Sequence, residues 1–408
     1  MKNQKFALGS MIIATSMILA ACGNTAAPAA TAAPAATTAP AATAAPAKQT
    51  EITFWHAYGT GSQEEVAMTT LVKQAQKDLP ELKINVLQVP FNDIFNKYRT
   101  DVASGAGPDM FIAPNDSLGD DARAKLIADI TDLVKGKLGD DTDIAVGGMT
   151  VDGKIYGVPE TIKGEAFFYN KDMVKNVPKT TDDILALIKG GVNGGMSYGC
   201  YQSWGFFNAF GGKVFDDKYN FVTDQGTGMA DAMTYLKSTF DALKANNMLF
   251  KDDQTGTPPF KEGKLGFIIN GNWMLADYSK ALGDKLGVAA LPAGPKGPST
   301  PLVGVDGFYI NPNSQNKDAA LKLALYLTNA ASQKVMMDGA GHVPVRKDVQ
   351  MTNPLVKAFY DALGNGQVRP QDKQMAKYWG NFCGTDDVYE KNVAPADWVK
   401  AATAGAKK

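Results

Sequence analysis

Apolar and polar positions alternate along most of this chain in two different periods. Residues 51–55 and 83–89 alternate at every second position, as half-buried strands do. Residues 63–78 carry apolar positions at helical spacing, and Ser62 with Glu65 three residues later fits a capping box at the start of that helix. The folded part therefore opens as a strand–helix–strand unit.

The same alternation of elements continues to the end of the chain. Further strands are predicted over 109–112, 157–159, 166–169, 265–269, 287–291 and 307–310. Further helices are predicted over 91–104, 182–190, 226–246, 272–282, 318–329 and 353–363. This order of strands and helices indicates an α/β protein, and its length indicates two lobes.

The first 50 residues follow neither period. A short basic segment precedes an apolar stretch over 11–20, which is too short to span a bilayer. The motif LAAC at 19–22 resembles the lipobox of bacterial lipoprotein signals, while an ordinary signal peptide is the alternative. We expect residues 1–21 to be removed and Cys22 to be lipidated, which anchors the protein on the outer side of the cell membrane.

Residues 22–50 form a second unusual segment, composed almost wholly of alanine, threonine and proline after the cysteine. Such a segment lacks the apolar side chains that would offset the entropy of ordering it. Its prolines favour extended conformations. We expect this segment to be a tether between the lipid anchor and the folded lobes.

Composition excludes several classes of function. The 408 residues include 41 basic and 42 acidic side chains, for a net charge of −1, so the basic excess typical of nucleic-acid binding is missing. The two histidines and three cysteines are too few for a Cys₄ zinc module. We therefore expect no nucleic-acid partner, no metal and no cofactor.

Motifs for nucleotide binding, calcium binding or catalysis are incomplete. After Gly59-Thr60-Gly61, Glu64 occupies the place of the third glycine of a dinucleotide fingerprint. The acidic stretch 139–143 lacks the glycine and the glutamate of a calcium loop. His56 and His342 lie far apart and no G-x-S-x-G motif occurs, so we expect no catalytic residue. The many acidic residues still leave a surface glycoside hydrolase as the alternative.

Three of the five tryptophans lie in polar surroundings. Trp204, Trp273 and Trp379 each have glycine, serine or asparagine neighbours. Each one suits a hydrophobic core. An aromatic ring at a loop edge also suits stacking against the apolar C–H face of a sugar, whose hydroxyl groups then need polar partners.

Short motifs in a fixed order give the chain a family resemblance. They are Ile52-Thr53-Phe54-Trp55, Gly107-Pro108-Asp109, the run 152–160, Glu165-Ala166, the run 169–172, the run 260–264, the run 269–273 and Val303-Gly304-Val305. In this order the chain, over nearly all of residues 50–400, resembles a solute-binding protein of a bacterial ABC importer. The resemblance is to the maltose/maltodextrin-binding type.

The resemblance implies a two-lobed clamshell like that of periplasmic binding proteins. The chain is expected to cross between the lobes three times, near 161–166, 300–306 and 350–353. Lobe one is expected to comprise 51–161 and 306–351, and lobe two 166–300 and 353–408. A protein of this kind is a monomer that captures an oligosaccharide and delivers it to the transmembrane subunits of an ABC permease. Another sugar, a polyamine or a peptide are the alternative ligands.

Ligand contacts can also be carried over from the family. Polar contacts are expected from Asp116 and Glu165. Aromatic contacts are expected from Tyr201, Trp273 and Trp379, with Trp204 close behind them.

The sequence departs from the family at two places. Ala113 stands where a tryptophan is common, and Gly59-Thr60 stand where an acidic and a basic residue often meet the sugar. We therefore expect His56 or Tyr58 to make the contact there.

Two cysteines remain for the folded part. Cys200 and Cys383 lie next to Tyr201 and near Trp379, both in the expected lobe two. If these aromatic residues converge, the sulfurs lie close enough for a disulfide in an oxidising exterior. Two buried free thiols are the alternative.

Overall fold

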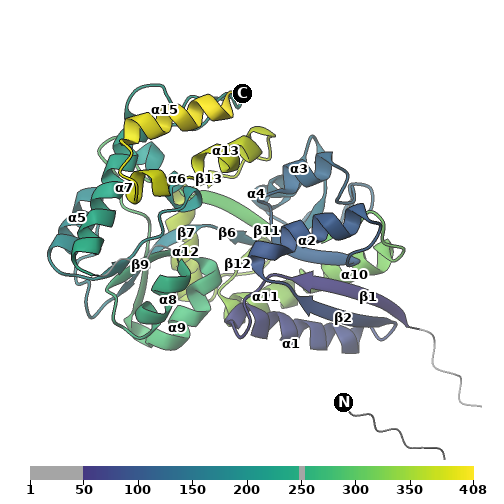
Figure 1. Ribbon diagram of the computed structural model, residues 1–408. Coiled ribbons are helices and arrows are strands. Elements are labelled where there is room, and N and C mark those ends of the chain that lie inside the picture. The colour runs from purple at the N-terminus through teal and green to yellow at the C-terminus, as the bar shows by residue number, and fades with distance from the viewer. Residues whose placement is uncertain (1–48, 248–252) are drawn as a thin grey trace, which may run out of the picture. The chain divides into compact units, whose positions relative to one another are not determined.

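The computed structural model describes residues 49–247 and 253–408, with the side chains of residues 253 and 254 left out. The stretch Ala47–Lys408 forms one compact unit (Figure 1). The predicted signal peptide, Cys22 and nearly all of the predicted tether lie outside the described residues. Within the described ranges, no helix combines the length and the apolar character needed to cross a membrane.

The larger of two main sheets mixes parallel and antiparallel strands, and we call it with its helices lobe one. Its central strand order is β12-β6-β11-β3-β1-β2. The strands are β1 Thr50–His56, β2 Leu82–Gln88, β3 Met110–Pro114, β6 Gly157–Lys163, β11 Leu302–Ile310 and β12 Val343–Pro344. Strand β1 runs parallel to β2 and β3, while β11 runs antiparallel to β3 and β6. Because β1 begins at Thr50, the tether ends one residue earlier than predicted.

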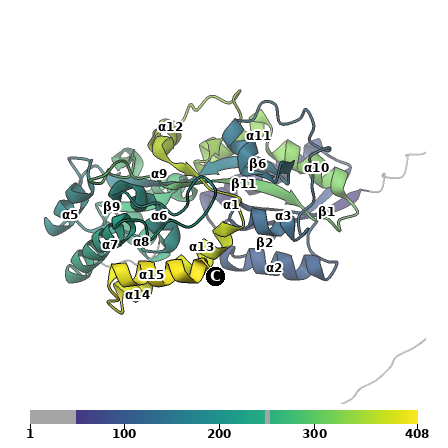
Figure 2. The same ribbon diagram turned by 90° about the horizontal axis from the view of Figure 1, so that it is seen from above.

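Helices pack on both faces of this sheet (Figures 1 and 2). They are α1 Gln63–Asp78, α2 Phe91–Ala103, α3 Leu118–Arg123, α4 Asp143–Gly148, α10 Lys317–Leu327 and α11 Ala330–Ala340. Side chains of α1, α10 and α11 form one buried cluster, and those of α2 and α3 form another. Directly after α4 in the chain, β4 (Thr150–Val151) and β5 (Lys154–Ile155) form a short antiparallel hairpin.

The smaller sheet, with its helices, is lobe two. Its order is β10-β7-β9-β8, with β7 Glu165–Asn170, β8 Gly194–Gly195, β9 Phe267–Gly271 and β10 Leu286–Ala289. The helices are α5 Thr181–Lys189, α6 Cys200–Phe207, α7 Gly228–Ala245, α8 Asp253–Lys261, α9 Leu275–Leu282, α12 Pro354–Ala362, α13 Gln374–Phe382, α14 Asp386–Tyr389 and α15 Pro395–Ala406. Aromatic side chains dominate its largest buried cluster.

The chain passes between the two sheets through short, extended connections. Gly164 alone separates β6 of lobe one from β7 of lobe two. Strand β11 starts beside β13 (Gln367–Val368) and then continues into the sheet of lobe one. After β12 the chain enters α12, which packs against β10 of lobe two. This is the two-lobed α/β architecture that the sequence predicted.

The periodicity missed several helices for identifiable reasons. In α6 five consecutive residues from Ser203 to Phe207 are buried, so the helix has no polar face that a period could reveal. Helix α8 contains Pro258 and Pro259, which argue against a helix from sequence. The predicted helix 272–282 is in fact a 3₁₀ turn over Asn272–Met274 followed by α9.

Candidate ligand-binding site at the junction of the lobes

A buried ammonium group lies where β6 leaves lobe one. The Lys163 Nζ atom is 2.8 Å from Glu64 Oε1 and 2.8 Å from Asp306 Oδ2. Glu64 comes from the first turn of α1 and Asp306 from the middle of β11. Burial alone would lower the pKa of Lys163, but the two carboxylates raise it above its usual value. The lysine is therefore charged and held in one position.

His342 extends this row of charges. Its Nε2 atom lies 2.7 Å from Glu64 Oε1, and its Nδ1 atom lies 2.9 Å from Glu160 Oε2. Burial alone would lower the pKa of His342, but the Glu160 carboxylate and the hydrogen bonds raise it to about 9. Burial would raise the pKa of Glu64, but Lys163 and His342 lower it to about 2. Both nitrogens of the ring thus carry protons near neutral pH, and the ring bridges the Glu64 and Glu160 carboxylates.

Two of the predicted ligand residues lie near the lysine, and a third stacks on one of them. Its Nζ atom lies 5.5 Å from the centre of the Tyr58 ring and 6.0 Å from that of Trp273, within reach of cation–π attraction. The His56 ring stacks on Tyr58 at 5.6 Å. A Cβ atom on Gly271 would lie 2.0 Å from the Trp273 ring, so only glycine lets the indole lie against the backbone there.

A second buried cation, Arg369, organises two more predicted residues. It follows β13, bonds to the carboxylate of Asp116, and donates to Asn115 Oδ1 at 3.1 Å. Its guanidinium lies 5.3 Å from the centre of the Tyr201 ring. The Tyr201 ring in turn lies 6.5 Å from the Trp273 ring, which joins the two groups of residues. Asp116, Tyr201 and Trp273 therefore converge.

The remaining predicted residues lie deeper or to one side. Glu165 is the first residue of β7 and is buried. Burial raises the pKa of Tyr201, the Arg369 charge lowers it, and the Glu165 charge raises it further. Trp204 is a core residue of lobe two, whose Nε1 donates to Gln367 Oε1 at 3.2 Å. Trp379 is half-buried and packs on Tyr378, with ring centres 5.1 Å apart.

Buried polar atoms without partners gather at this junction. Six side-chain atoms in the described part are buried there with no hydrogen-bond partner, namely His56 Nδ1, Tyr58 OH, Asn272 Oδ1, Asp306 Oδ1, Tyr309 OH and Arg369 Nε. An unsatisfied buried polar group typically costs about 1–3 kcal/mol. The set includes both donors and acceptors, so it suits a ligand or water that offers both.

A disulfide supports the lobe-two side of the site. Cys200, the first residue of α6, is bonded to Cys383, which follows α13, with the Cα atoms 4.6 Å apart. The Tyr378 hydroxyl also donates to the Cys200 carbonyl at 2.8 Å. Of the two alternatives for these cysteines, the structure has the disulfide, which ties the start of α6, where Tyr201 lies, to the end of α13.

Sequence reasoning missed the charged centre of the site. Strand β6 carries Glu160 and Lys163, and β11 carries Asp306, although every residue of both strands is buried. A buried charge of this kind needs a partner. That was an available signal. Arg369 offered none, because it follows a two-residue strand in an otherwise irregular stretch. Related proteins often have an acidic and a basic residue where this chain has Gly59 and Thr60. Here Glu64 and Lys163 provide an acidic and a basic group near Tyr58 instead.

The chemistry of the junction favours binding of polar, uncharged groups. Lys163 and Arg369 are each paired with carboxylates, so neither a free acid–base pair nor an unpaired anionic patch is formed by these groups. Across the described ranges, no group of three or more His, Cys, Asp or Glu side chains is placed to hold a metal ion.

Comparison with known proteins identifies relatives. A family model described as bacterial extracellular solute-binding protein matches residues 70–360. A maltotriose-binding protein of Pyrococcus abyssi is 26% identical over 366 residues, which cover 85% of this chain and 79% of the relative. A maltooligosaccharide ABC transporter solute-binding lipoprotein of Streptococcus pneumoniae is 28% identical over 320 residues, covering 70% of this chain and 72% of the relative.

Solved structures agree with these relatives. The maltotriose-binding protein of Thermus thermophilus, bound with maltotriose, superposes with a TM-score of 0.79 at 27% identity. The superposition covers 87% of this chain and 99% of that protein. A maltose/maltodextrin-binding domain from Bdellovibrio bacteriovorus has the same fold, with a TM-score of 0.79 at 20% identity.

Proposed function

This chain belongs to the family of bacterial extracellular solute-binding proteins, and from that premise we propose that it captures a maltodextrin-like oligosaccharide at the junction of its lobes. It is a binding protein of the ABC-transporter type and not an enzyme. Relatives named for maltotriose and maltooligosaccharides support the choice of ligand.

The observation that carries this proposal is the set of unpartnered polar atoms between aromatic rings. Tyr58 OH and Asp306 Oδ1 are buried beside Lys163, while the Trp273 and Tyr201 rings lie next to them. A sugar offers what such a set lacks, because its hydroxyl groups both donate and accept and its C–H face packs on an indole.

Binding from both lobes explains how capture is linked to closure. Lobe one provides Tyr58, Asp116 and the charged residues bonded to Lys163, while lobe two provides Tyr201 and Trp273. A ligand that contacts both sides binds the closed arrangement more tightly than an open one, and so shifts the population toward it. We propose that the transmembrane subunits of an ABC permease recognise that closed form.

The charges disfavour a polyamine as the ligand. Lys163 and Arg369 are buried cations at the junction, and the carboxylates nearest to them, Glu64, Asp306 and Asp116, are already paired. A polycation would meet two like charges without an unpaired acid to offset them. A neutral sugar has no such conflict.

The location outside the cytoplasm follows the family, and its details are part of the proposal. We propose that the protein is a monomer tethered by the segment between Cys22 and β1 to a lipid on Cys22. The motif LAAC at 19–22 supports this, as does the lipoprotein name of the pneumococcal relative.

Calorimetry on the full chain tests the function. Maltotriose and longer maltodextrins should bind saturably, spermidine should not, and chromatography after overnight incubation should find the sugars intact. Release of shorter sugars would establish the hydrolase alternative instead. Failure of every maltodextrin, with binding of spermidine or a peptide, would overturn the sugar assignment.

A further inference from the structure

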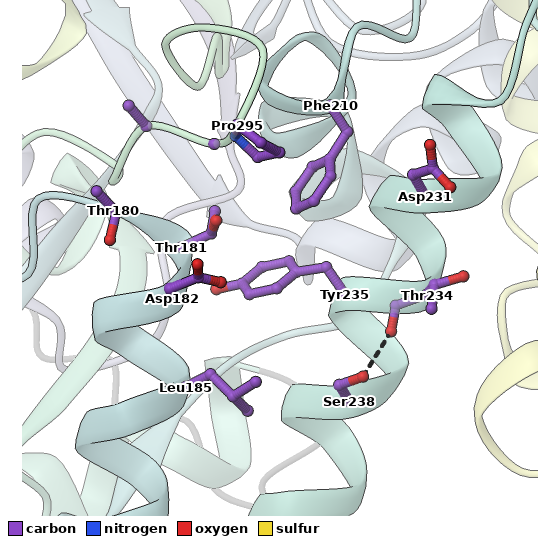
Figure 3. Close-up of a pocket in the computed structure, with 12 residues that line it drawn as sticks. Thr180, Thr181, Asp182, Leu185, Phe210, Asp231, Thr234, Tyr235, Ser238 and Pro295 are labelled. Atoms are coloured by element: carbon purple, nitrogen blue, oxygen red, sulfur yellow. Dashed lines mark hydrogen bonds between the residues drawn. The ribbon is translucent and has the colours of Figure 1, made fainter.

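A pocket lies within lobe two, among residues that take no part in the junction. Its cavity volume is about 380 Å³, within the range of small-molecule sites. Its walls are α5, α7, the 3₁₀ turn Asn208–Phe210 and the loop 293–295 (Figure 3). Helices α5 and α7 lie at the end of lobe two that is remote from β1 and β2 (Figures 1 and 2). We propose that this pocket binds a single neutral sugar ring.

Two stacked aromatic rings supply an apolar face. The Phe210 and Tyr235 rings lie 5.3 Å apart with an interplanar angle of 29°, and Figure 3 shows the Tyr235 ring reaching from α7 toward Asp182 on α5. Phe210 is partly exposed, so one of its faces is available to the C–H face of a sugar. The Tyr235 hydroxyl is buried and has no hydrogen-bond partner among the described residues.

The polar groups around these rings mainly accept hydrogen bonds. The Thr234 hydroxyl donates to the Ala230 carbonyl at 2.8 Å, and the Ser238 hydroxyl donates to the Thr234 carbonyl at 2.9 Å. Each hydroxyl has a single hydrogen, so both offer only lone pairs to a ligand. The carboxylates of Asp182 and Asp231 add further acceptors. Such a lining fits a ligand that presents several O–H donors.

The position of the two carboxylates favours a neutral ligand over a cation. Asp182 lies in the first turn of α5 and Asp231 in the first turn of α7. The positive end of each helix dipole offsets part of the negative charge there, so the field that would attract a cation is reduced. The hydrogen-bonding capacity of the carboxylates remains, and hydroxyl groups can use it.

The walls of the pocket are fixed before any ligand arrives. A Cβ atom on Gly294 would lie 2.4 Å from the Ala209 carbonyl oxygen, so the loop packs directly on the 3₁₀ turn. The Thr181 amide donates to the Ala293 carbonyl at 2.8 Å, and the Lys296 amide donates to the Ala209 carbonyl at 2.9 Å. A preformed site loses less entropy on binding than a mobile one.

Methyl NMR on the full chain, labelled at threonine and alanine, tests the proposal with methyl α-D-glucopyranoside as the probe. Saturable shifts are expected for the methyl groups of Thr234 and Ala293, with a dissociation constant on the order of 1–10 mM. Phe210→Leu and Asp231→Asn should each weaken these shifts at least about fivefold, because one removes the aromatic face and the other an anionic acceptor.

Matched variants separate this site from the junction. Asp241→Asn, also on α7 but paired with Lys237 outside the pocket, should leave the Thr234 titration unchanged. Trp273→Ala should also leave it unchanged, whether or not the junction binds sugar. Absence of a titration at 50 mM glucoside, or shifts with n-butylammonium chloride but not with the glucoside, would overturn the proposal.

Discussion

Lys163 neutralises two buried carboxylates at the junction of the lobes. Its ammonium is bonded to Glu64 and Asp306, and all three side chains are at most 10% exposed. Burial raises the pKa of Asp306 to about 6 even though the lysine lies beside it. Removing one partner of such a group leaves a buried charge unpaired, which typically costs about 3–5 kcal/mol. The three bonded side chains of Lys163, Glu64 and Asp306 are therefore held in place within the site.

Trp273 provides the most direct test of the sugar site at the scale of one residue. Trp273→Ala should lower the affinity for maltotriose by about 1–3 kcal/mol, roughly 5- to 150-fold, because aromatic contact in a desolvated site is lost. Calorimetry measures this change. Trp398→Phe serves as the control, since Trp398 is buried in α15 of lobe two and should leave the affinity unaltered. Equal affinities for both variants would make Trp273 a packing residue only.

His342 should make stability depend on pH above neutrality. Its pKa in the folded protein is about 9, above the ordinary value of 6.5, so the folded state holds the proton more tightly. That contribution is fully present below about pH 6.5 and is lost as the pH rises through about 9. At about 1.4 kcal/mol per pKa unit, the loss in unfolding free energy should be on the order of 3 kcal/mol.

Urea unfolding at pH 6.5 and 9.5 measures this loss. His342→Gln keeps polar groups near Glu64 and Glu160 without a titrating proton, so this variant should be less stable at pH 6.5 and change less between the two values. A wild-type protein whose stability is the same at both values would contradict the charged state of His342.

At the scale of elements, one covalent bond joins two helices of the site. The Cys200–Cys383 disulfide connects the start of α6 to the end of α13 across 183 positions of sequence. Such a cross-link restricts the unfolded chain, and removal typically costs about 2–5 kcal/mol. Cys200→Ser with Cys383→Ser should therefore lower the thermal midpoint, and sugar affinity should fall through the freer position of Tyr201. Scanning calorimetry with and without reductant checks the first expectation. A midpoint that is insensitive to both changes would contradict it.

Prediction of elements from sequence succeeded where one face of an element is buried. Helix α1 was predicted, and its Ser62 side chain accepts a hydrogen bond from the Glu65 amide. The other half of the predicted capping box is absent, because the Glu65 carboxylate accepts from the Gly61 amide and the Ser62 amide donates to the Gly59 carbonyl. Helices α6 and α13 were missed, although the tryptophans that they carry were singled out. Their lengths of eight and nine residues and the burial of most of α6 leave too little period to detect.

At the scale of the whole molecule, hydrogen bonds join the two lobes. The Gln63 amide in α1 donates to Asp277 Oδ2 in α9 at 3.1 Å, and Arg123 Nη1 donates to the Gln371 carbonyl at 3.0 Å. Neither contact involves a predicted sugar residue. Both stabilise the arrangement of the lobes that the structure has, and we propose that this is the form that a ligand selects.

Asp277→Ala should weaken sugar binding although Asp277 is not a predicted ligand contact. Loss of the Gln63 contact favours the open form. The apparent affinity for the sugar is proportional to the fraction of protein that is closed, and we expect it to fall about three- to tenfold. Calorimetry gives the affinity, and small-angle scattering should report a larger radius for the free variant. Asp172→Ala is the control, because Asp172 pairs with Lys285 within lobe two. Unchanged affinity and radius would show that this contact does not bias closure.

The sequence by itself determined the α/β class, the two-lobed architecture and the family, and it singled out Tyr58, Tyr201 and Trp273, which the structure brings together. These follow from periodicity and from short motifs, both of which are local in the chain. The tertiary structure alone decided that Lys163 and Arg369 organise the junction. Their charged partners lie up to 253 positions away, and the pairing of β11 with both β6 and β13 helps to bring these charges together. A charged residue in a buried strand indicates from sequence that a partner of opposite charge is needed, but only the fold shows which residue that partner is.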